Sequence, residues 1–101
     1  MCIAREEIFG PVITILESTD LVDAISLSNN TEAGLRNIVF SSGQVQALEV
    51  PDAMNTISVG INFFISNQAA PFGGRNDSGL GVEYAPEGLA AYLSYKSIHR
   101  T

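Results

Sequence analysis

Positive charge is scarce in this sequence. Its 101 residues include five Lys plus Arg against eleven Asp plus Glu, and the formal net charge is −6. No basic run interleaved with aromatic residues occurs, whereas proteins that bind nucleic acid or anionic membranes present clustered cations. The composition therefore argues against nucleic acid and membrane surfaces as partners, and it favours a small neutral or polar ligand.

Cysteine and histidine are almost absent. Cys2 is the one cysteine and His99 the one histidine, so the sequence offers neither a disulfide framework nor a multi-residue metal site. No apolar run reaches the length of a membrane span, and residues 1–7 carry two acids rather than a basic leader. We expect a protein of a reducing compartment, the cytoplasm, with no metal.

Short β-branched runs and helical spacing alternate over the first 62 residues. The runs that predict strands lie at residues 11–16, 37–40 and 56–62. Helical spacing predicts helices over residues 21–28 and 43–50, and Pro51 ends or kinks the second. Because such alternation is typical of right-handed crossover units, the predicted fold class is α/β, with a partial parallel β-α-β-α-β sheet.

Regular structure is expected to stop at Phe63 and to resume near residue 85. The intervening segment is rich in glycine but keeps bulky residues such as Phe64 and Phe72, which is typical of a long, ordered, functional loop. A short helix is predicted after Pro86. Alternation over residues 94–100 predicts a terminal strand whose partner would be another subunit or a segment outside this sequence.

Several short motifs occur in an order and spacing that resemble the aldehyde dehydrogenase family. They are EEIFGP at residues 6–11, NTEAGL at 30–35, GIN at 60–62, APFGG at 70–74, SGLG at 78–81, PEGL at 86–89 and KSI at 96–98. Each is weak alone, but together they cover nearly the whole chain. The resemblance implies an NAD(P)-dependent enzyme that oxidises aldehydes to carboxylic acids.

The resemblance also implies an organisation. Residues 1–85 would form the C-terminal part of the catalytic domain, and residues 86–101 a short helix and an oligomerisation-type tail strand. In full-length members the dinucleotide-binding domain, the glutamate general base and the catalytic cysteine lie upstream of this region, and Met1 falls inside the family pattern. We therefore expect a fragment, either a truncated product or an excised domain, that is inactive alone and forms homo-oligomers through residues 94–101.

Two residues near the start match the family's cofactor site. Glu7 matches a carboxylate that accepts hydrogen bonds from the nicotinamide ribose hydroxyls of NAD or NADP, and the alternative is that Glu6 and Glu7 are merely solvated. Phe9 matches the aromatic beside that ribose, and the alternative is a buried core aromatic.

Two later residues match the substrate side. Phe72 matches an aromatic of the substrate tunnel, with core packing under the loop as the alternative. Glu83 matches a second glutamate that relays protons, which a partly buried carboxylate would suit; an exposed acid at the start of a helix is the alternative.

Four glycines and Cys2 could suggest a phosphate-binding loop and a nucleophile, but the neighbouring sequence supports neither. The glycines at 73, 74, 79 and 81 are not followed by Lys-Ser or Lys-Thr, so turn glycines with positive φ are favoured over a phosphate cradle. Cys2 lies outside the family's catalytic position, and we assign it no role beyond a free thiol.

The sequence departs from the family pattern at several positions. Arg36 and Asn37 replace small residues before the second predicted strand, and Val82 and Ser94 replace charged residues of the stretch that supports the family's subunit interface. We expect an altered contact between subunits. Two rival interpretations remain beside the enzyme fragment: an association module that pairs by strand addition, and a product without its own function.

Overall fold

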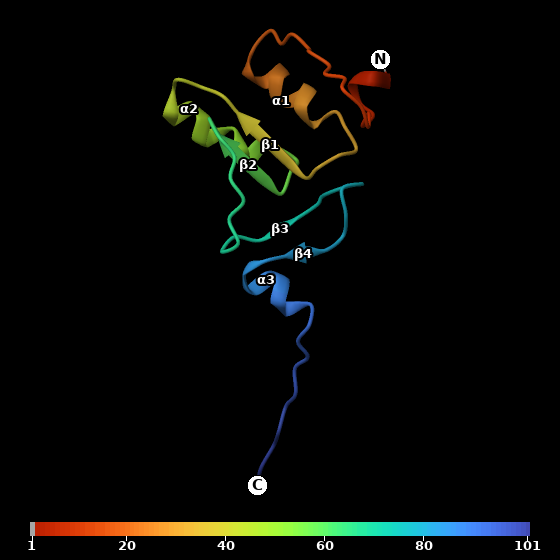
Figure 1. Cartoon of the computed structure of the whole chain (residues 1–101). Coiled ribbons are helices and arrows are strands. Elements are labelled where there is room, and N and C mark those ends of the chain that lie inside the picture. The colour runs from red at the N-terminus through yellow and green to blue at the C-terminus, as the bar shows by residue number, and fades with distance from the viewer. Residues whose placement is uncertain (1) are drawn as a thin grey trace.

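In a computed structural model of the chain, residues 2–101 are described, apart from the side chains at positions 44–46 (Figure 1). The helices are α1 (Leu21–Asn29), α2 (Gln44–Glu49) and α3 (Ala85–Ala90), with short 3-10 helices η1 (Cys2–Ala4) and η2 (Pro51–Ala53). The strands are β1 (Arg36–Val39), β2 (Ser58–Ile61), β3 (Phe72–Gly73) and β4 (Val82–Glu83). The predicted α/β fold class is confirmed.

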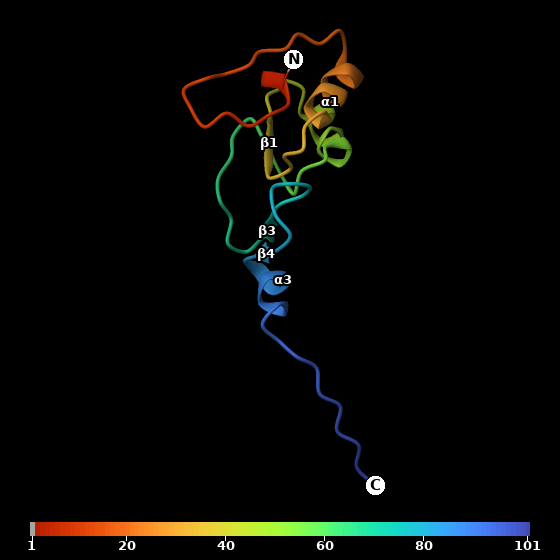
Figure 2. The same cartoon turned by 90° about the vertical axis from the view of Figure 1, so that its right-hand side faces the viewer.

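The parallel pair of β1 and β2 is the centre of the fold. Arg36 lies opposite Ser58 and Val39 opposite Ile61, and α2 forms part of the crossover between the two strands. Both α1 and α2 lie on one side of this pair, while residues 62–71 pass on the other (Figure 2). Parallel strands require a crossover because each must begin at the same edge of the sheet.

Helix α1 begins where the sequence supplies reciprocal capping groups. The Asp20 carboxylate accepts from the Asp23 amide at 2.8 Å, and the Asp23 carboxylate accepts from the Thr19 amide at 2.9 Å. These bonds satisfy amides that have no partner within the first helical turn. The predicted helix is therefore confirmed.

Helix α2 stops as Pro51 predicts. Val50 keeps right-handed helical angles, and the chain continues into η2. Pro51 is the first residue of η2, where its missing amide N–H breaks no helical hydrogen bond. Ala47 and Val50 are the buried apolar residues of the described part of the chain. The core is thus very small and lies on α2 and its C-terminal end.

The predicted first strand, at residues 11–16, does not form. Ile13 and Ile15 are mostly exposed, and the Thr14 hydroxyl donates to the Ile3 carbonyl across a loop. A strand exists only through hydrogen bonds to a neighbour, and no neighbouring strand is present for this segment among residues 2–101. The β-branched run identified a segment suited to a sheet but not its partner.

The segment predicted as an irregular loop, residues 63–84, contains a small antiparallel ladder. Phe72 pairs with Glu83, and Gly73 pairs with Val82. A Cβ on Gly73 would lie 2.3 Å from the Gly81 carbonyl oxygen, so the two strands approach too closely for any side chain there. The ladder of two pairs was too short to show as a strand pattern in the sequence.

The C-terminal tail runs away from the rest of the chain (Figure 2). Residues 91–101 form no helix or strand, and Tyr95 and Ile98 are exposed. The tail thus has no strand partner among the described residues, and pairing with another chain stays a prediction.

Among the described residues 2–101, no helix is long and apolar enough to cross a membrane.

The exposed area is large for the mass. The chain exposes 8477 Å² at 10.8 kDa, whereas a folded monomer of this mass exposes roughly 5,500 Å². Its radius of gyration is 17.8 Å, against about 13 Å for a compact domain of this length. Much of its apolar surface is therefore available for cover by other protein.

Asn62 provides a test of the central strand pair. Its side chain accepts from the Ser41 amide at 2.8 Å and donates to the Ser41 carbonyl at 2.9 Å, which ties the carboxyl ends of β1 and β2 together. Asn62 has φ 60°, a conformation that asparagine and glycine tolerate better than other residues. We expect Asn62→Ala to lower the free energy of unfolding by about 2 kcal/mol and Asn62→Gly by about 1 kcal/mol. Urea unfolding followed by circular dichroism measures both, and equal losses would contradict the role of the positive φ.

Candidate functional site

Gly34 joins the three loops from which the candidate site is built. Its carbonyl accepts from the Ile57 amide at 3.3 Å and the Arg75 amide at 3.1 Å, and its amide donates to the Ser78 hydroxyl at 2.8 Å. A Cβ at this position would lie 2.9 Å from the Arg75 and Asn55 carbonyl oxygens. The close approach therefore requires glycine, and it fixes the loops after α1, after η2 and after β3 against one another.

Glu7 lines an acidic cleft of about 330 Å³ beside this junction. The lining residues are Arg5, Glu6, Glu7, Thr31, Glu32, Ala33, Asp77 and Ser78. Four carboxylates stand there against one guanidinium, so the cleft disfavours phosphate groups. Carboxylate oxygens are hydrogen-bond acceptors, which suits the hydroxyl groups of a sugar.

The segment that carries Glu7 accepts hydrogen bonds from two threonine hydroxyls, of which that of Thr31 comes from the body. Thr31 donates to the Arg5 carbonyl at 3.2 Å, and Thr14 donates to the Ile3 carbonyl at 3.2 Å. The Thr31 hydroxyl also accepts from the Ala33 amide at 3.2 Å, which fixes its rotamer. Thr31 thus couples the Glu7 segment to the Gly34 junction.

Phe9 lies two residues beyond Glu7 and is 95% exposed. The alternative of a buried core aromatic is therefore wrong for the chain as described. This exposed phenyl ring offers an apolar face to any group that covers the N-terminal segment.

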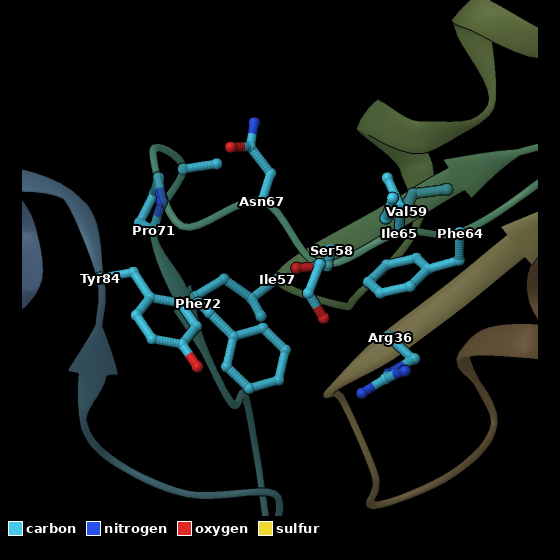
Figure 3. A pocket seen from close by; sticks show the side chains of 12 residues that line it. Arg36, Ile57, Ser58, Val59, Phe64, Ile65, Asn67, Pro71, Phe72 and Tyr84 are labelled. Atoms are coloured by element: carbon cyan, nitrogen blue, oxygen red, sulfur yellow. The ribbon is translucent and has the colours of Figure 1, made fainter.

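Phe72 lines a separate cavity of about 520 Å³ (Figure 3). Its ring lies 6.2 Å from the Tyr84 ring, centroid to centroid, in a tilted arrangement. Tyr84 has φ 63° and Ala85 has φ 52°, so the turn into α3 holds Tyr84 in an uncommon conformation beside Phe72. Phe72 is half-buried and forms a wall of the cavity.

Glu83 is exposed and lines a groove of about 430 Å³ that Phe72 also lines. Because Phe72 and Glu83 are directly paired across β3 and β4, their Cα atoms are cross-strand neighbours. The partial burial that would suit a proton relay is not present in the chain as described. The structure thus brings Phe72 and Glu83 together, and it places Glu7 and Phe9 in the N-terminal segment.

The glycine-rich loop is needed mainly for close backbone approach. Gly79 has φ 129°, as expected of a turn glycine, but Gly73 and Gly74 do not have positive φ. A Cβ on Gly74 would lie 2.3 Å from the Ser78 carbonyl oxygen. The expectation of positive φ was therefore right for Gly79 and wrong for Gly73, Gly74 and Gly81. Cys2 is an exposed free thiol.

Arg36, Phe64 and Tyr84 are cavity residues that the sequence interpretation did not assign to a site. The Arg36 guanidinium lies 4.7 Å from the Phe64 ring centroid and 6.0 Å from that of Phe72. In the sequence, Arg36 is a cation at a position where the family has a small residue, just before a predicted strand. That departure is the signal that could have identified Arg36 as a site residue.

Comparison with known proteins identifies the class of protein that this fold and these clefts define. The model of the aldehyde dehydrogenase family matches residues 1–98. The chain therefore belongs to the aldehyde dehydrogenase family, whose members are oxidoreductases.

Individual relatives share about two fifths of their aligned residues with the chain. It is 42% identical over 97 residues to a geranial dehydrogenase from Castellaniella defragrans and 39% identical over 95 residues to a glutarate-semialdehyde dehydrogenase from Pseudomonas putida. These alignments cover 96% and 93% of the chain, but 20% of each relative. The chain thus spans about a fifth of the length of the curated relatives that it matches.

Solved structures give the same result. A Mycobacterium tuberculosis aldehyde dehydrogenase complexed with NAD+ superimposes with a TM-score of 0.86 at 36% identity, covering 91% of this chain and 19% of that protein. A mutant betaine aldehyde dehydrogenase from Staphylococcus aureus, also in complex with NAD+, gives a TM-score of 0.89 at 39% identity and covers 95% of this chain and 20% of that protein. The backbone of the chain is therefore that of the matching region in these enzymes.

Thr31 offers a test of how the Glu7 segment is held. Thr31→Val removes the hydroxyl but keeps the branched shape, so we expect amide hydrogen exchange at residues 3–8 to accelerate several-fold as the segment detaches. Thr31→Ser keeps both hydrogen bonds and serves as the matched control. Unchanged exchange in Thr31→Val would show that other contacts hold the segment.

Proposed function

We propose that the chain is a component of an NAD(P)-dependent aldehyde dehydrogenase and has no dehydrogenase activity by itself. The family match over residues 1–98 carries this proposal, together with coverage of about a fifth of each relative. In this proposal residues 1–85 belong to the catalytic domain, and residues 86–101 form a short helix and a tail that pairs with another subunit. The single cysteine, which is free and exposed, supports a reducing compartment such as the cytoplasm.

The proposed role of Glu7 is to orient the nicotinamide ribose. A carboxylate offers two acceptor oxygens, which match a pair of vicinal hydroxyls, and the acidic lining of the cleft suits hydroxyls better than phosphates. Phe9 would supply an apolar face beside the same sugar. The cleft fits the sugar part of the cofactor, and the relatives' remaining four fifths would bind the rest.

The proposed substrate side lies at the β3–β4 ladder. The ring of Phe72 would form a wall of the site, and Glu83, its cross-strand neighbour, would accept or release a proton. The cofactor, when bound, accepts a hydride. The residues of this chain contribute placement: Glu7 and Phe9 position one reactant, and Phe72 and Glu83 face the other, so their contribution is proximity and orientation.

A turnover assay tests the inactivity. We expect the purified chain, mixed with NAD or NADP and a range of aldehydes, to produce no increase in absorbance of the reduced cofactor. The attacking thiolate belongs, by this proposal, to protein outside the chain. Steady turnover by the chain alone would overturn the fragment interpretation.

Complementation tests the positive half of the proposal. The chain would be coexpressed with the geranial dehydrogenase from Castellaniella defragrans truncated before the matched region, and aldehyde-dependent turnover would be measured. We expect Glu7→Gln to raise KM for the cofactor about tenfold, because it weakens a charge-assisted hydrogen bond. Glu6→Gln, the neighbouring control, should leave KM unchanged. Equal effects of the two substitutions would remove the ribose role from Glu7.

A second candidate function, association, is favoured by the exposed apolar surface. Tyr95 and Ile98 on the tail are 103% and 79% exposed, and Phe9 and Ile13 at the other end are also open. Large apolar side chains that are exposed together are typical of surfaces that contact other protein. The chain would then pair with a second copy or with a full-length dehydrogenase by adding its tail to a sheet edge.

Light scattering distinguishes the two candidates. If association is the function, the chain forms a tight dimer whose mass is indifferent to NAD, and the double substitution Tyr95→Ser with Ile98→Ser shifts it toward monomer. Ser94→Ala is the control, because it leaves the apolar residues of the tail in place. A monomer that binds cofactor would count against the association module.

A further inference from the structure

Arg36 occupies an unusual place at the start of β1. It lies opposite Ser58 in the parallel register, and its side chain enters the cavity that Phe64 and Phe72 line (Figure 3). The cavity volume, about 520 Å³, lies in the range of small-molecule sites. The open form of the cavity leaves the guanidinium accessible from solvent, since Arg36 is exposed.

The cavity differs from the rest of the chain in charge. The chain carries a formal charge of −6, but no Asp or Glu is among the described residues that line this cavity, and Arg36 supplies its one formal charge. The acidic cleft around Glu7 has the opposite character. An anion would therefore be attracted to the cavity and repelled from the cleft.

The contacts of Arg36 leave its hydrogen-bonding capacity for a ligand. The Phe64 and Phe72 rings attract the positive charge at 4.7 and 6.0 Å from their centroids. Ring faces do not satisfy the five N–H donors of a guanidinium as oxygen acceptors would. The N–H groups of Arg36 can therefore donate to a ligand. A planar carboxylate suits them because its two oxygens can accept two parallel hydrogen bonds from one guanidinium.

The other residues that line the cavity indicate the chemical character of the rest of such a ligand. Ile57, Val59, Ile65 and the rings of Phe64 and Phe72 present apolar surface, and Ser58 adds a hydroxyl. A phosphate would bring nearly two charges to a single cation, whereas a carboxylate brings one. We propose that this cavity binds a monocarboxylate with an apolar body, whose carboxylate pairs with Arg36.

The proposal also bears on the substrate. Phe72 forms a wall of both this cavity and the proposed substrate site, so the enzyme would favour aldehydes that carry a carboxylate at the end remote from the aldehyde. That extension rests on the proposed function. Carboxylate binding itself does not, because it requires neither cofactor nor nucleophile.

The rival account is that Arg36 is a clamp. In that account, its stacking on Phe64 holds the segment after β2 against β1, and the charge has no ligand. A clamp predicts that removing Arg36 disturbs the fold and affects neutral and anionic ligands alike.

Ligand-observed saturation-transfer NMR with hexanoate and hexanamide separates the two accounts, and it works whether the chain is monomeric or associated. We expect hexanoate to bind the 101-residue chain at least about tenfold more tightly than hexanamide, as a charge-assisted bidentate contact requires. Arg36→Met should abolish that preference, and Arg36→Lys, which keeps the charge but not the fork, should retain part of it. Arg75→Met, which removes an exposed arginine outside the cavity, should preserve it fully.

Three results would overturn the proposal. Equal binding of hexanoate and hexanamide to the unmodified chain would do so, as would an equal loss in Arg75→Met. A loss of both ligands in Arg36→Met, with a changed far-ultraviolet circular dichroism spectrum, would establish the clamp. If Arg36→Met does not fold, the comparison of hexanoate with hexanamide on the unmodified chain and on Arg36→Lys decides. Failure here leaves the role of Glu7 in cofactor binding intact, and failure of the Glu7 test leaves this one intact.

Discussion

The backbone of Gly34 receives the Ile57 and Arg75 amides on its carbonyl and donates its own amide to Ser78. Through these bonds, three loops that are distant in sequence meet at a point where no side chain fits. The acidic cleft lies on one side of this point, and β1, which begins two residues later with Arg36, lies on the other. Since the chain buries so few apolar residues, such backbone bonds carry much of the spatial relation between its sites.

By the proposed function, the surface that would close these sites belongs to other protein. The exposed area exceeds that of a compact monomer of the same mass by roughly 3,000 Å². An area of this size is comparable to the area buried in obligate interfaces. Phe9 and the tail are parts of this surface, which is why their exposure is compatible with their proposed roles.

Local signals predicted the elements whose caps, stops or strand partners lie within this chain. The caps of α1, the stop at Pro51, and the strands β1 and β2 followed from cap residues, proline geometry and β-branched runs. The segment at residues 11–16 was predicted wrongly, because a strand depends on a neighbour that its own sequence does not encode. The motif resemblance identified the family and marked Arg36 as a departure, but it could not reveal the cavity, whose lining joins segments that are distant in sequence.

The distribution of charge gives the two hollows different chemistry despite a shared scaffold. Four carboxylates gather around Glu7, whereas the Phe72 cavity contains Arg36 and no acid among its described lining residues. A ligand with hydroxyl groups is compatible with the first and an anion with the second, because the carboxylates of the cleft accept hydrogen bonds from hydroxyls and repel anions, whereas Arg36 attracts anions. Two reactants that differ in this way would be sorted to their own sides before any chemistry begins. The Gly34 junction, which holds the loops bordering both hollows, would then set the distance between them.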